Sequence, residues 1–153
     1  MDRCASVLLP LVLLFLAALL PYGNALRTGF AYDDAAIVIE NPTASPAAPW
    51  WTPLVRPYWP EPHDAGLYRP LTSLTYRLQR GWTGTAPVPF HLLNVLLHAA
   101  TSLLAYAVLR RLFTRQGWAL PIALLFAVHP LHTEAVTGIV GRAELLAALC
   151  GLG

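Results

Sequence analysis

Long apolar stretches alternate along this chain with short clusters of arginine and with one long polar segment. The first stretch, residues 5–26, contains no charged side chain and lies between Arg3 and Arg27. Comparable stretches follow at residues 90–109 and 118–140, and another begins at residue 143. A helix needs roughly 20 apolar residues to cross a bilayer. The pattern therefore predicts an all-α membrane protein in which these stretches are spans and residues 27–89 form a loop.

The composition also favours a membrane protein. Hydrophobic residues make up 56% of the chain and charged residues only 12%, whereas a soluble domain carries about 25% charged residues. The net charge of +2 is too small and too scattered for a nucleic-acid-binding surface. The two cysteines, Cys4 and Cys150, form neither a CxxC pair nor a metal-binding pattern, so we expect no disulfide between them.

The first apolar stretch has two interpretations. It is long enough for a retained span, but its densest part, residues 7–20, also has the length of a signal-peptide core. Small residues at 23–25 stand at the spacing of a cleavage site. Hydropathy alone leaves the retained helix and the cleaved signal peptide equally open.

The polar segment at residues 27–89 is rich in proline and in aromatic residues. Its prolines are too closely spaced for long regular elements, and the aromatic residues between them are types that favour the lipid headgroup layer. We therefore expect a compact cap that packs against the membrane surface. The prolines are Pro42, Pro46, Pro49, Pro53, Pro57, Pro60 and Pro62, and the aromatic residues are Trp50, Trp51, Tyr58, Trp59 and Tyr68.

One amphipathic helix is predicted inside this loop. Apolar residues recur there at intervals of four and three residues, which places them on one face of a helix. Pro70 suits the first turn, where its missing N–H costs nothing. Arginines lie off this face, so we expect the helix to lie in the membrane interface with its apolar side toward lipid. The apolar residues are Leu67, Leu71, Leu74, Leu78 and Trp82, and the arginines are Arg69, Arg77 and Arg80.

A cluster of arginines between the second and third spans predicts the orientation of the chain. Arg110, Arg111 and Arg115 should remain in the cytoplasm by the positive-inside rule. The connection between these two spans is short, so they should form an antiparallel hairpin. The polar loop and residues 129–134 then lie together on the extracytoplasmic side, and the first stretch fits as a retained span.

Two candidate groups lie in the polar loop. Asp33 and Asp34 follow the first span by a few residues, and an acidic pair at a membrane surface can supply a general base. The alternative is a solvated turn in which Asp34 caps the short apolar stretch after it.

Arg69 precedes a predicted helix start, where a guanidinium and free backbone N–H groups can bind phosphate. Extension of the same side chain to lipid headgroups is an equal alternative.

A third candidate group lies at the end of the third apolar stretch. His129, His132 and Glu134 place two imidazoles and a carboxylate at membrane depth, where ionisable groups mark functional sites. Their spacing matches no zinc pattern, so hydrogen bonding to a substrate is favoured over a metal site.

Other polar residues of the spans are expected to bond between helices. His91, Asn94 and His98 share one face of the second span, and that face should look into the bundle. Arg142 and Glu144 are two residues apart, so they do not face each other on a helix, and each should find a partner elsewhere.

Four blocks of sequence resemble one known family. They resemble, in the same order, motifs of the multi-span O-mannosyltransferases that carry carboxy-terminal tetratricopeptide repeats. Each block alone is weak, but four in order are specific, and together they cover most of the chain. The blocks are Phe30-Ala31-Tyr32-Asp33-Asp34 with the run from Ile37 to Pro42, then Tyr68-Arg69-Pro70-Leu71-Thr72, the run from Phe90 to His98, and the run from His129 to Val136 with Gly141-Arg142-Ala143-Glu144.

The resemblance implies a GT-C glycosyltransferase, a multi-span helical bundle of which this chain is the amino-terminal part. Such an enzyme transfers a sugar, here mannose, from a polyprenyl-phosphate carrier to a protein hydroxyl outside the cytoplasm. The resemblance implies that Asp33, and after it Asp34, is the catalytic base of a single inverting step. The other candidates are Arg69 and Arg142 for the donor phosphate, and His129, His132 and Glu134 for the sugar or the acceptor.

The resemblance also bears on cofactors, partners and location. It favours a retained first helix over a cleaved signal peptide. No metal-ligand set is assigned, and a divalent metal is left open as a cofactor. The implied partners are the lipid-linked sugar, a protein acceptor and membrane lipid, without nucleic acid. The implied location is the inner membrane in a bacterium or the endoplasmic reticulum membrane in a eukaryote.

A different class of function stays open at this point. The chain ends at Gly153 inside an apolar run and holds no tetratricopeptide repeat, so we expect a fragment that is inactive by itself. The alternative is a non-catalytic multi-span module, such as part of a transporter or of a larger complex, in which the acidic pair is structural. Further spans followed by repeats of about 34 residues would favour the transferase.

Overall fold

The computed structural model describes residues 3–62, 66–113 and 116–153. Within these ranges the chain is helical and forms no strand, which confirms the predicted all-α class. The α-helices are α1 (Arg3–Leu19), α2 (Thr52–Val55), α3 (Pro70–Thr83), α4 (Pro87–Leu112), α5 (Ala119–Val128), α6 (Thr133–Thr137) and α7 (Arg142–Leu152). Short 3-10 turns at Leu20–Arg27, Pro42–Ala44, Gln116–Trp118, Pro130–His132 and Ile139–Gly141 and a π-helical turn at Ala35–Glu40 connect them.

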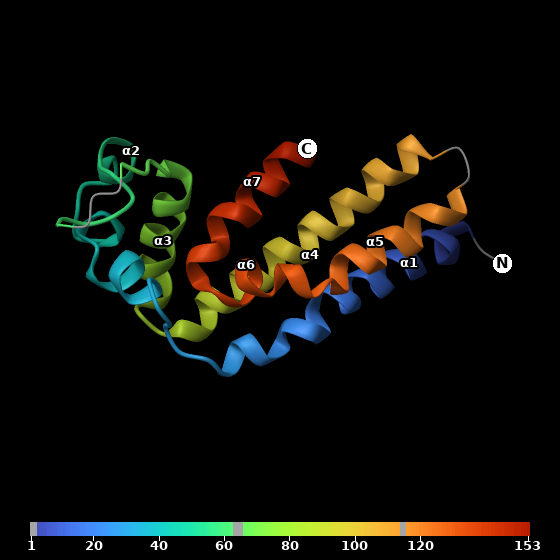
Figure 1. Ribbon diagram of the computed structural model, residues 1–153, viewed down its shortest axis with the longest axis horizontal. Helices are drawn as coiled ribbons and strands as arrows, with labels where there is room; N and C mark the ends of the chain where they lie inside the picture. The colour runs from blue at the N-terminus through green and yellow to red at the C-terminus, as the bar shows by residue number, and fades with distance from the viewer. Residues whose placement is uncertain (1–2, 63–65, 114–115) are drawn as a thin grey trace.

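The helices form a bundle with a cap at one end (Figure 1). Helices α1, α4 and α5 pack side by side, and α5 returns along α4 as the predicted hairpin. The polar loop folds into the cap together with α2 and α3, and α7 lies between α3 and α4. The cap and α6 lie toward one end of α4, and the last turn of α4 and the start of α5 lie at the other end. Arg110 and Arg111 lie in this last turn of α4, and Arg115 lies outside the described residues.

Among the residues that the structure describes, two helices are long and apolar enough to cross a membrane. They are Leu8–Arg27, which joins α1 to the 3-10 turn after it, and α4. Much of the apolar surface of α1 faces outward, and Leu8 and Leu9 are each 61% exposed. In a membrane such outward leucines contact lipid at no cost. The chain is therefore a membrane protein, as its hydropathy predicts.

The third predicted span is not one straight helix. The predicted span over 118–140 is bent, because α5 ends at Val128 and the chain turns by 45° into the segment Pro130–Thr137. The physical reason is Pro130, which lacks an N–H and pushes the residue before it out of the helical region. His129 accordingly has the extended torsions φ −67° and ψ 127°. Together, α5 and the segment Pro130–Thr137 form either one broken span or a re-entrant segment.

Small residues let the bundle helices approach closely. The bundle core joins α1, α4 and α5 through alanines, one leucine and one tyrosine, and helix interfaces in membranes favour such small side chains. A second core lies under the cap, where residues from the loop meet the start of α4 and the segment before α7. The bundle core is Leu14, Ala18, Ala99, Tyr106, Ala119, Ala123 and Ala127, and the cap core is Ile37, Val38, Ala44, Tyr58, Tyr76, Phe90 and Ile139.

The polar face of α4 is directed into the bundle, as predicted. His98 Nε2 lies 2.9 Å from the Ala127 carbonyl oxygen, near the end of α5, where a helix leaves its last carbonyls without partners. Asn94 donates to the carbonyl oxygens of Gly138 at 2.8 Å and Ile139 at 3.2 Å. These bonds give hydrogen-bond partners to backbone carbonyls of the third apolar segment, at places where its helices are interrupted.

The amphipathic helix α3 turns its polar side inward and its apolar side outward. Thr72, Ser73 and Tyr76 are buried against the rest of the protein, whereas Leu71 is 51% and Trp82 is 85% exposed. This arrangement suits a helix whose apolar side meets lipid. The prediction is wrong at one residue, because helix α3 begins at Pro70 and Leu67 lies in the extended segment before it.

Glycine 141 allows the closest backbone approach in the segment between α6 and α7. A Cβ added at Gly141 would lie 2.3 Å from the Ala135 carbonyl oxygen, a backbone atom that cannot move aside. We predict that Gly141→Ala lowers the stability of the full-length protein by about 2 kcal/mol or more, because overpacking forces a backbone shift. The measurement is loss of the monodisperse detergent-solubilised protein on heating.

The matched control for this prediction is Gly151→Ala on α7. Nothing lies within 4 Å of a Cβ added at Gly151, and alanine there favours the helix. This variant should match or exceed the parent in thermal stability. Equal stability of Gly141→Ala and Gly151→Ala would contradict the packing of the 138–141 segment described above.

Candidate functional site

A cavity of about 680 Å³ lies between the cap and the segments that carry α6 and α7. Its polar lining consists mainly of four carboxylates and one guanidinium, and aromatic and aliphatic side chains complete the wall. Four residues singled out from the sequence meet here from three separate regions of the chain. They are Asp33, Asp34, Arg69 and Glu134.

The two adjacent aspartates have different environments. Asp34 is buried, and its carboxylate accepts hydrogen bonds from the backbone N–H groups of Ala31 at 3.1 Å and Val140 at 3.0 Å. The second bond joins segments 106 residues apart. The predicted helix cap is wrong, because the Asp34 side chain makes no capping bond to the turn that follows it. Asp34 instead fastens the loop after α1 to the cavity wall before α7.

Asp33 is the free carboxylate of the pair. It is exposed and lines the cavity, and its side chain makes no hydrogen bond or ion pair with any other described residue. Tyr32, immediately before it, is fully exposed and has a positive φ of 48°. Such a conformation is uncommon for a residue with a bulky side chain and recurs at functional sites. The arrangement leaves Asp33 able to accept a proton from a bound hydroxyl.

The loop around these aspartates is held by the Asn41-Pro42 block. Asn41 is buried, its side-chain amide donates to the Tyr58 carbonyl oxygen at 2.8 Å, and its side-chain oxygen accepts from the Thr43 N–H at 2.8 Å. The Tyr58 N–H in turn donates to the Leu67 carbonyl oxygen at 2.8 Å. Local hydrogen bonding by asparagine therefore connects the turn after Asp33 to the segment that leads to Arg69.

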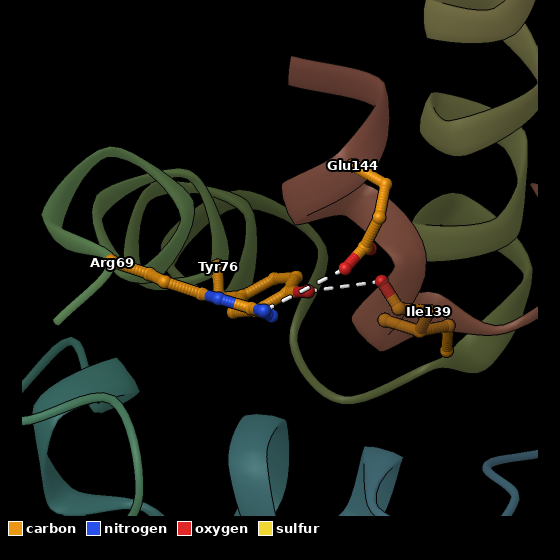
Figure 2. A network of polar contacts seen from close by, with 4 residues as sticks. All are labelled: Arg69, Tyr76, Ile139 and Glu144. Atoms are coloured by element: carbon orange, nitrogen blue, oxygen red, sulfur yellow. Dashed lines mark hydrogen bonds and ion pairs between the residues drawn. The ribbon is translucent and has the colours of Figure 1, made fainter. Parts of the chain in front are cut away.

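Arg69 extends from the start of α3 toward α7, where it meets Glu144 (Figure 2). Its Nη2 atom lies 3.6 Å from a carboxylate oxygen of Glu144. Its guanidinium carbon also lies 5.1 Å from the centre of the Tyr58 ring, within the range of a cation–π contact. Both members of the ion pair line the cavity. Arg69 is the guanidinium that the cavity can present to an anion.

Tyr58 was not singled out as a site residue by the sequence. Its side chain is almost completely buried, yet it lines the cavity, and its hydroxyl makes no hydrogen bond among the described residues. Burial raises the pKa of the Tyr58 hydroxyl, so the group stays protonated. Glu144 and Trp59 are further lining residues that the sequence did not assign. Glu144 belongs to the fourth family-like block, which was the available signal, whereas Tyr58 and Trp59 lie in no block.

Arg142 lies away from the cavity that it was expected to serve. Its side chain is 0% exposed, and its guanidinium donates to the Asn94 side-chain oxygen at 2.9 Å, the Phe90 carbonyl oxygen at 3.1 Å and the Thr75 hydroxyl at 3.3 Å. The guanidinium carbon also lies 4.6 Å from the centre of the Tyr76 ring. A side chain so fully engaged cannot contact a phosphate in this structure. The reason is its position at the first residue of α7, facing α3 and α4.

The two histidines of the third candidate group also lie apart from the cavity lining. The His129 ring nitrogen Nδ1 accepts from the Leu131 N–H at 3.2 Å. The centre of the His132 ring lies 4.5 Å from the centre of the Phe126 ring and 5.2 Å from the centre of the His98 ring. Of this group, Glu134 alone lines the cavity. His132 and Glu134 lie on the same segment after the bend, and residues two apart on a helical segment do not face the same side. Within the described residues no three His, Cys, Asp or Glu side chains are placed to hold a metal ion.

Comparison with known proteins identifies relatives. The chain is 43% identical to the protein O-mannosyl-transferase TMTC1 of Homo sapiens over 139 residues, which is 87% of this chain. It is 42% identical to the protein O-mannosyl-transferase TMTC3 of Mus musculus over 132 residues, or 84% of this chain. Most of this chain is homologous to the protein O-mannosyl-transferases. The protein O-mannosyl-transferase Tmtc1 of Drosophila melanogaster is 39% identical over 140 residues, or 86% of this chain.

These relatives confirm the resemblance that the sequence motifs indicated. The chain spans about one sixth of the length of the protein O-mannosyl-transferases that it matches, with 16%, 14% and 16% of the three relatives covered. No family model matches the chain, and no solved structure matches it.

The two aspartates of this O-mannosyl-transferase homologue should respond differently to the same substitution. Asp34→Asn replaces one of two acceptor oxygens by an NH₂ group, so it should lower the stability of the full-length protein by about 1–3 kcal/mol through a lost hydrogen bond to a charged acceptor. Asp33→Asn should leave stability within about 0.5 kcal/mol, because its carboxylate is exposed. Thermal unfolding of both detergent-solubilised variants measures the difference. A larger loss for Asp33→Asn would refute the assignment of Asp34 as the anchoring residue.

Proposed function

We propose that the protein to which this chain belongs transfers mannose from a polyprenyl-phosphate carrier to a protein hydroxyl, on the extracytoplasmic side of the membrane. The observation that carries the proposal is the meeting of a free carboxylate, Asp33, with a partly buried guanidinium, Arg69, in the lining of one cavity. The names of the relatives support protein O-mannosyl transfer as the reaction.

The proposed chemistry assigns one proton acceptor and one phosphate ligand. The acceptor hydroxyl attacks the anomeric carbon while its proton passes to Asp33, and the bond from that carbon to the carrier phosphate breaks. The departing phosphate is a good leaving group that needs charge stabilisation more than a proton. Arg69 supplies this charge, and a guanidinium suits the geometry of phosphate oxygens. One displacement with one base inverts the anomeric configuration, as in GT-C enzymes.

The other lining residues have supporting roles in this proposal. Glu134 lies on the α6 side of the cavity and accepts hydrogen bonds from sugar or acceptor hydroxyls. The protonated Tyr58 hydroxyl is a donor available to the same region. Arg142 and Asp34 position the wall of the site and do not contact the substrate. His129 and His132 do not line the cavity, and we assign them no step.

The non-catalytic membrane module is the weaker interpretation. It was favoured by the polar face of the second span and required both aspartates to be structural. His98 and Asn94 bond to backbone carbonyls, which accounts for much of that face without a transported ligand. The Asp33 carboxylate bonds to no other described residue, so a purely structural role would not account for it.

The catalytic assignment predicts a loss of transfer when Asp33 is neutralised. Asp33→Asn in the full-length protein should lower the rate of transfer by about 10²–10⁴-fold, because the amide cannot take the proton of the acceptor. The measurement is transfer from radiolabelled polyprenyl-phosphate mannose to acceptor protein in membranes. Normal expression, membrane insertion and thermal stability are the controls. Transfer within a few-fold of the parent would refute the assignment of Asp33 as the base.

The proposed orientation places the cap outside the cytoplasm and the end of α4 inside. In a protein whose other cysteines are replaced, Ala47→Cys should react with a membrane-impermeant maleimide on intact cells. Arg111→Cys should react only after permeabilisation. Both positions are exposed in the structure, so access differs only through the membrane. The reverse pattern would place the cavity on the cytoplasmic side and contradict the proposed transfer of extracytoplasmic sugar.

A further inference from the structure

A second hollow adjoins the cavity on the other side of the Arg69–Glu144 pair. It is a groove of about 360 Å³ between the start of α3 and the outer side of α7. Its walls are mostly apolar, and its lining from the two helices is Pro70, Leu71, Thr72, Ala143, Leu146, Ala147 and Cys150. Leu71, Ala147 and Cys150 are exposed, so the described residues leave the groove open on this side.

The groove and the cavity meet at one ion pair. Arg69 and Glu144 line both hollows, and the Arg69 Nη2 atom lies 3.6 Å from the Glu144 carboxylate between them. Figure 2 shows the Arg69 side chain reaching across from α3 to Glu144 on α7. From the cavity to the groove, the lining therefore changes from carboxylates to the single cation Arg69 and then to apolar side chains. A ligand that matches this order has a polar head, an anionic link and an apolar tail.

The ion pair is weak enough to be replaced by such a ligand. The Arg69 and Glu144 side chains are 34% and 56% exposed, and exposed pairs contribute only about 0–1 kcal/mol. A phosphate diester offers Arg69 two oxygens in a geometry that a guanidinium binds through two parallel hydrogen bonds. Phosphate therefore competes well with a single carboxylate contact, and Glu144 can turn toward water when it is displaced.

We propose that the groove between α3 and α7 holds the first isoprene units of the lipid carrier, whose phosphate replaces Glu144 on Arg69. The inference rests on the proposed function, because the carrier is the donor named there. The sugar then lies in the cavity beside Asp33, and the tail leaves past Leu71 and Cys150 toward the lipid. Glu144 acts as a competitor that occupies Arg69 when no donor is bound.

Two neighbouring alanines on α7 provide a matched test of the groove. Ala147 lines it, whereas Ala148 is also exposed and lines neither hollow. In the full-length protein Ala147→Trp should fill the groove and raise the KM for a polyprenyl-phosphate sugar by about tenfold or more, the cost of leaving one isoprene unit unburied. The kcat at saturating donor should change little. Ala148→Trp should leave both constants as in the parent.

A third variant tests the competition at Arg69. Glu144→Gln removes the charge that occupies the guanidinium and keeps the size of the side chain. It should lower the KM for the donor by a few-fold and leave the KM for the acceptor unchanged. A raised donor KM in this variant would refute the role of Glu144 as a competitor.

Cys150 reports occupancy of the groove without any transfer reaction. It is a free, exposed thiol that lines the groove. In full-length protein whose other cysteines are replaced, reconstituted into phosphatidylcholine nanodiscs, polyprenyl phosphate should slow maleimide labelling of Cys150. Mannose 1-phosphate, which has no tail, and polyprenol, which has no phosphate, should not. Ala147→Trp should abolish the protection by polyprenyl phosphate, and Ala148→Trp should retain it.

The outcomes separate this inference from the proposed function. Transfer by the parent protein without protection of Cys150, and with equal donor KM for both tryptophan variants, would overturn the groove and leave the transferase intact. Equal protection by phosphatidylglycerol would show that any anionic lipid fills the groove and would also overturn the proposal. Protection by polyprenyl phosphate alone, in a protein that transfers no sugar, would support the lipid site and refute the transferase.

Discussion

A buried arginine is the interaction on which the rest of this structure depends. Burying a cation costs several kcal/mol unless hydrogen bonds and nearby dipoles replace its water. The Arg142 guanidinium is surrounded by acceptors from α3 and α4 and by two aromatic rings, and no carboxylate among the described residues pairs with it. Its position therefore requires α3, α4 and α7 to meet in one relative placement. Apolar contacts alone would tolerate sliding of these helices, whereas a set of directional bonds to one cation does not.

The same network shapes the wall of the candidate site. Asn94 accepts from Arg142 and donates to the carbonyls of Gly138 and Ile139, and the Tyr76 hydroxyl donates to the Ile139 carbonyl at 2.9 Å (Figure 2). The short segment before α7 is thus held from two helices, and Asp34 bonds to it from the cap side. Asp33 and Glu144 project from these fixed parts into the cavity. Side chains on a well-supported backbone lose little entropy when a ligand binds.

The membrane explains why the cap and the bundle differ in their packing. The bundle joins helices through alanines and leaves leucines on its outer surface, where lipid replaces a protein partner. The cap buries mostly aromatic and branched side chains and satisfies its irregular backbone through side chains such as Asn41. Irregular backbone also occurs at the bend after α5, and there His98 and Asn94 provide the hydrogen bonds that a bilayer cannot supply.

The sequence by itself determined the helical class, the two long spans, the outward apolar side of α3 and the family, because hydropathy, helical periodicity and short motifs are local properties. It also selected Asp33 and Arg69, which the structure places in one cavity. Tertiary structure alone decided that Asp34 is an anchor and Arg142 a core residue, since their partners Val140 and Asn94 lie 106 and 48 residues away. Spacing along a chain does not reveal such partners. For the same reason only the fold could place Glu144 beside Arg69, where a polar cavity and an apolar groove meet.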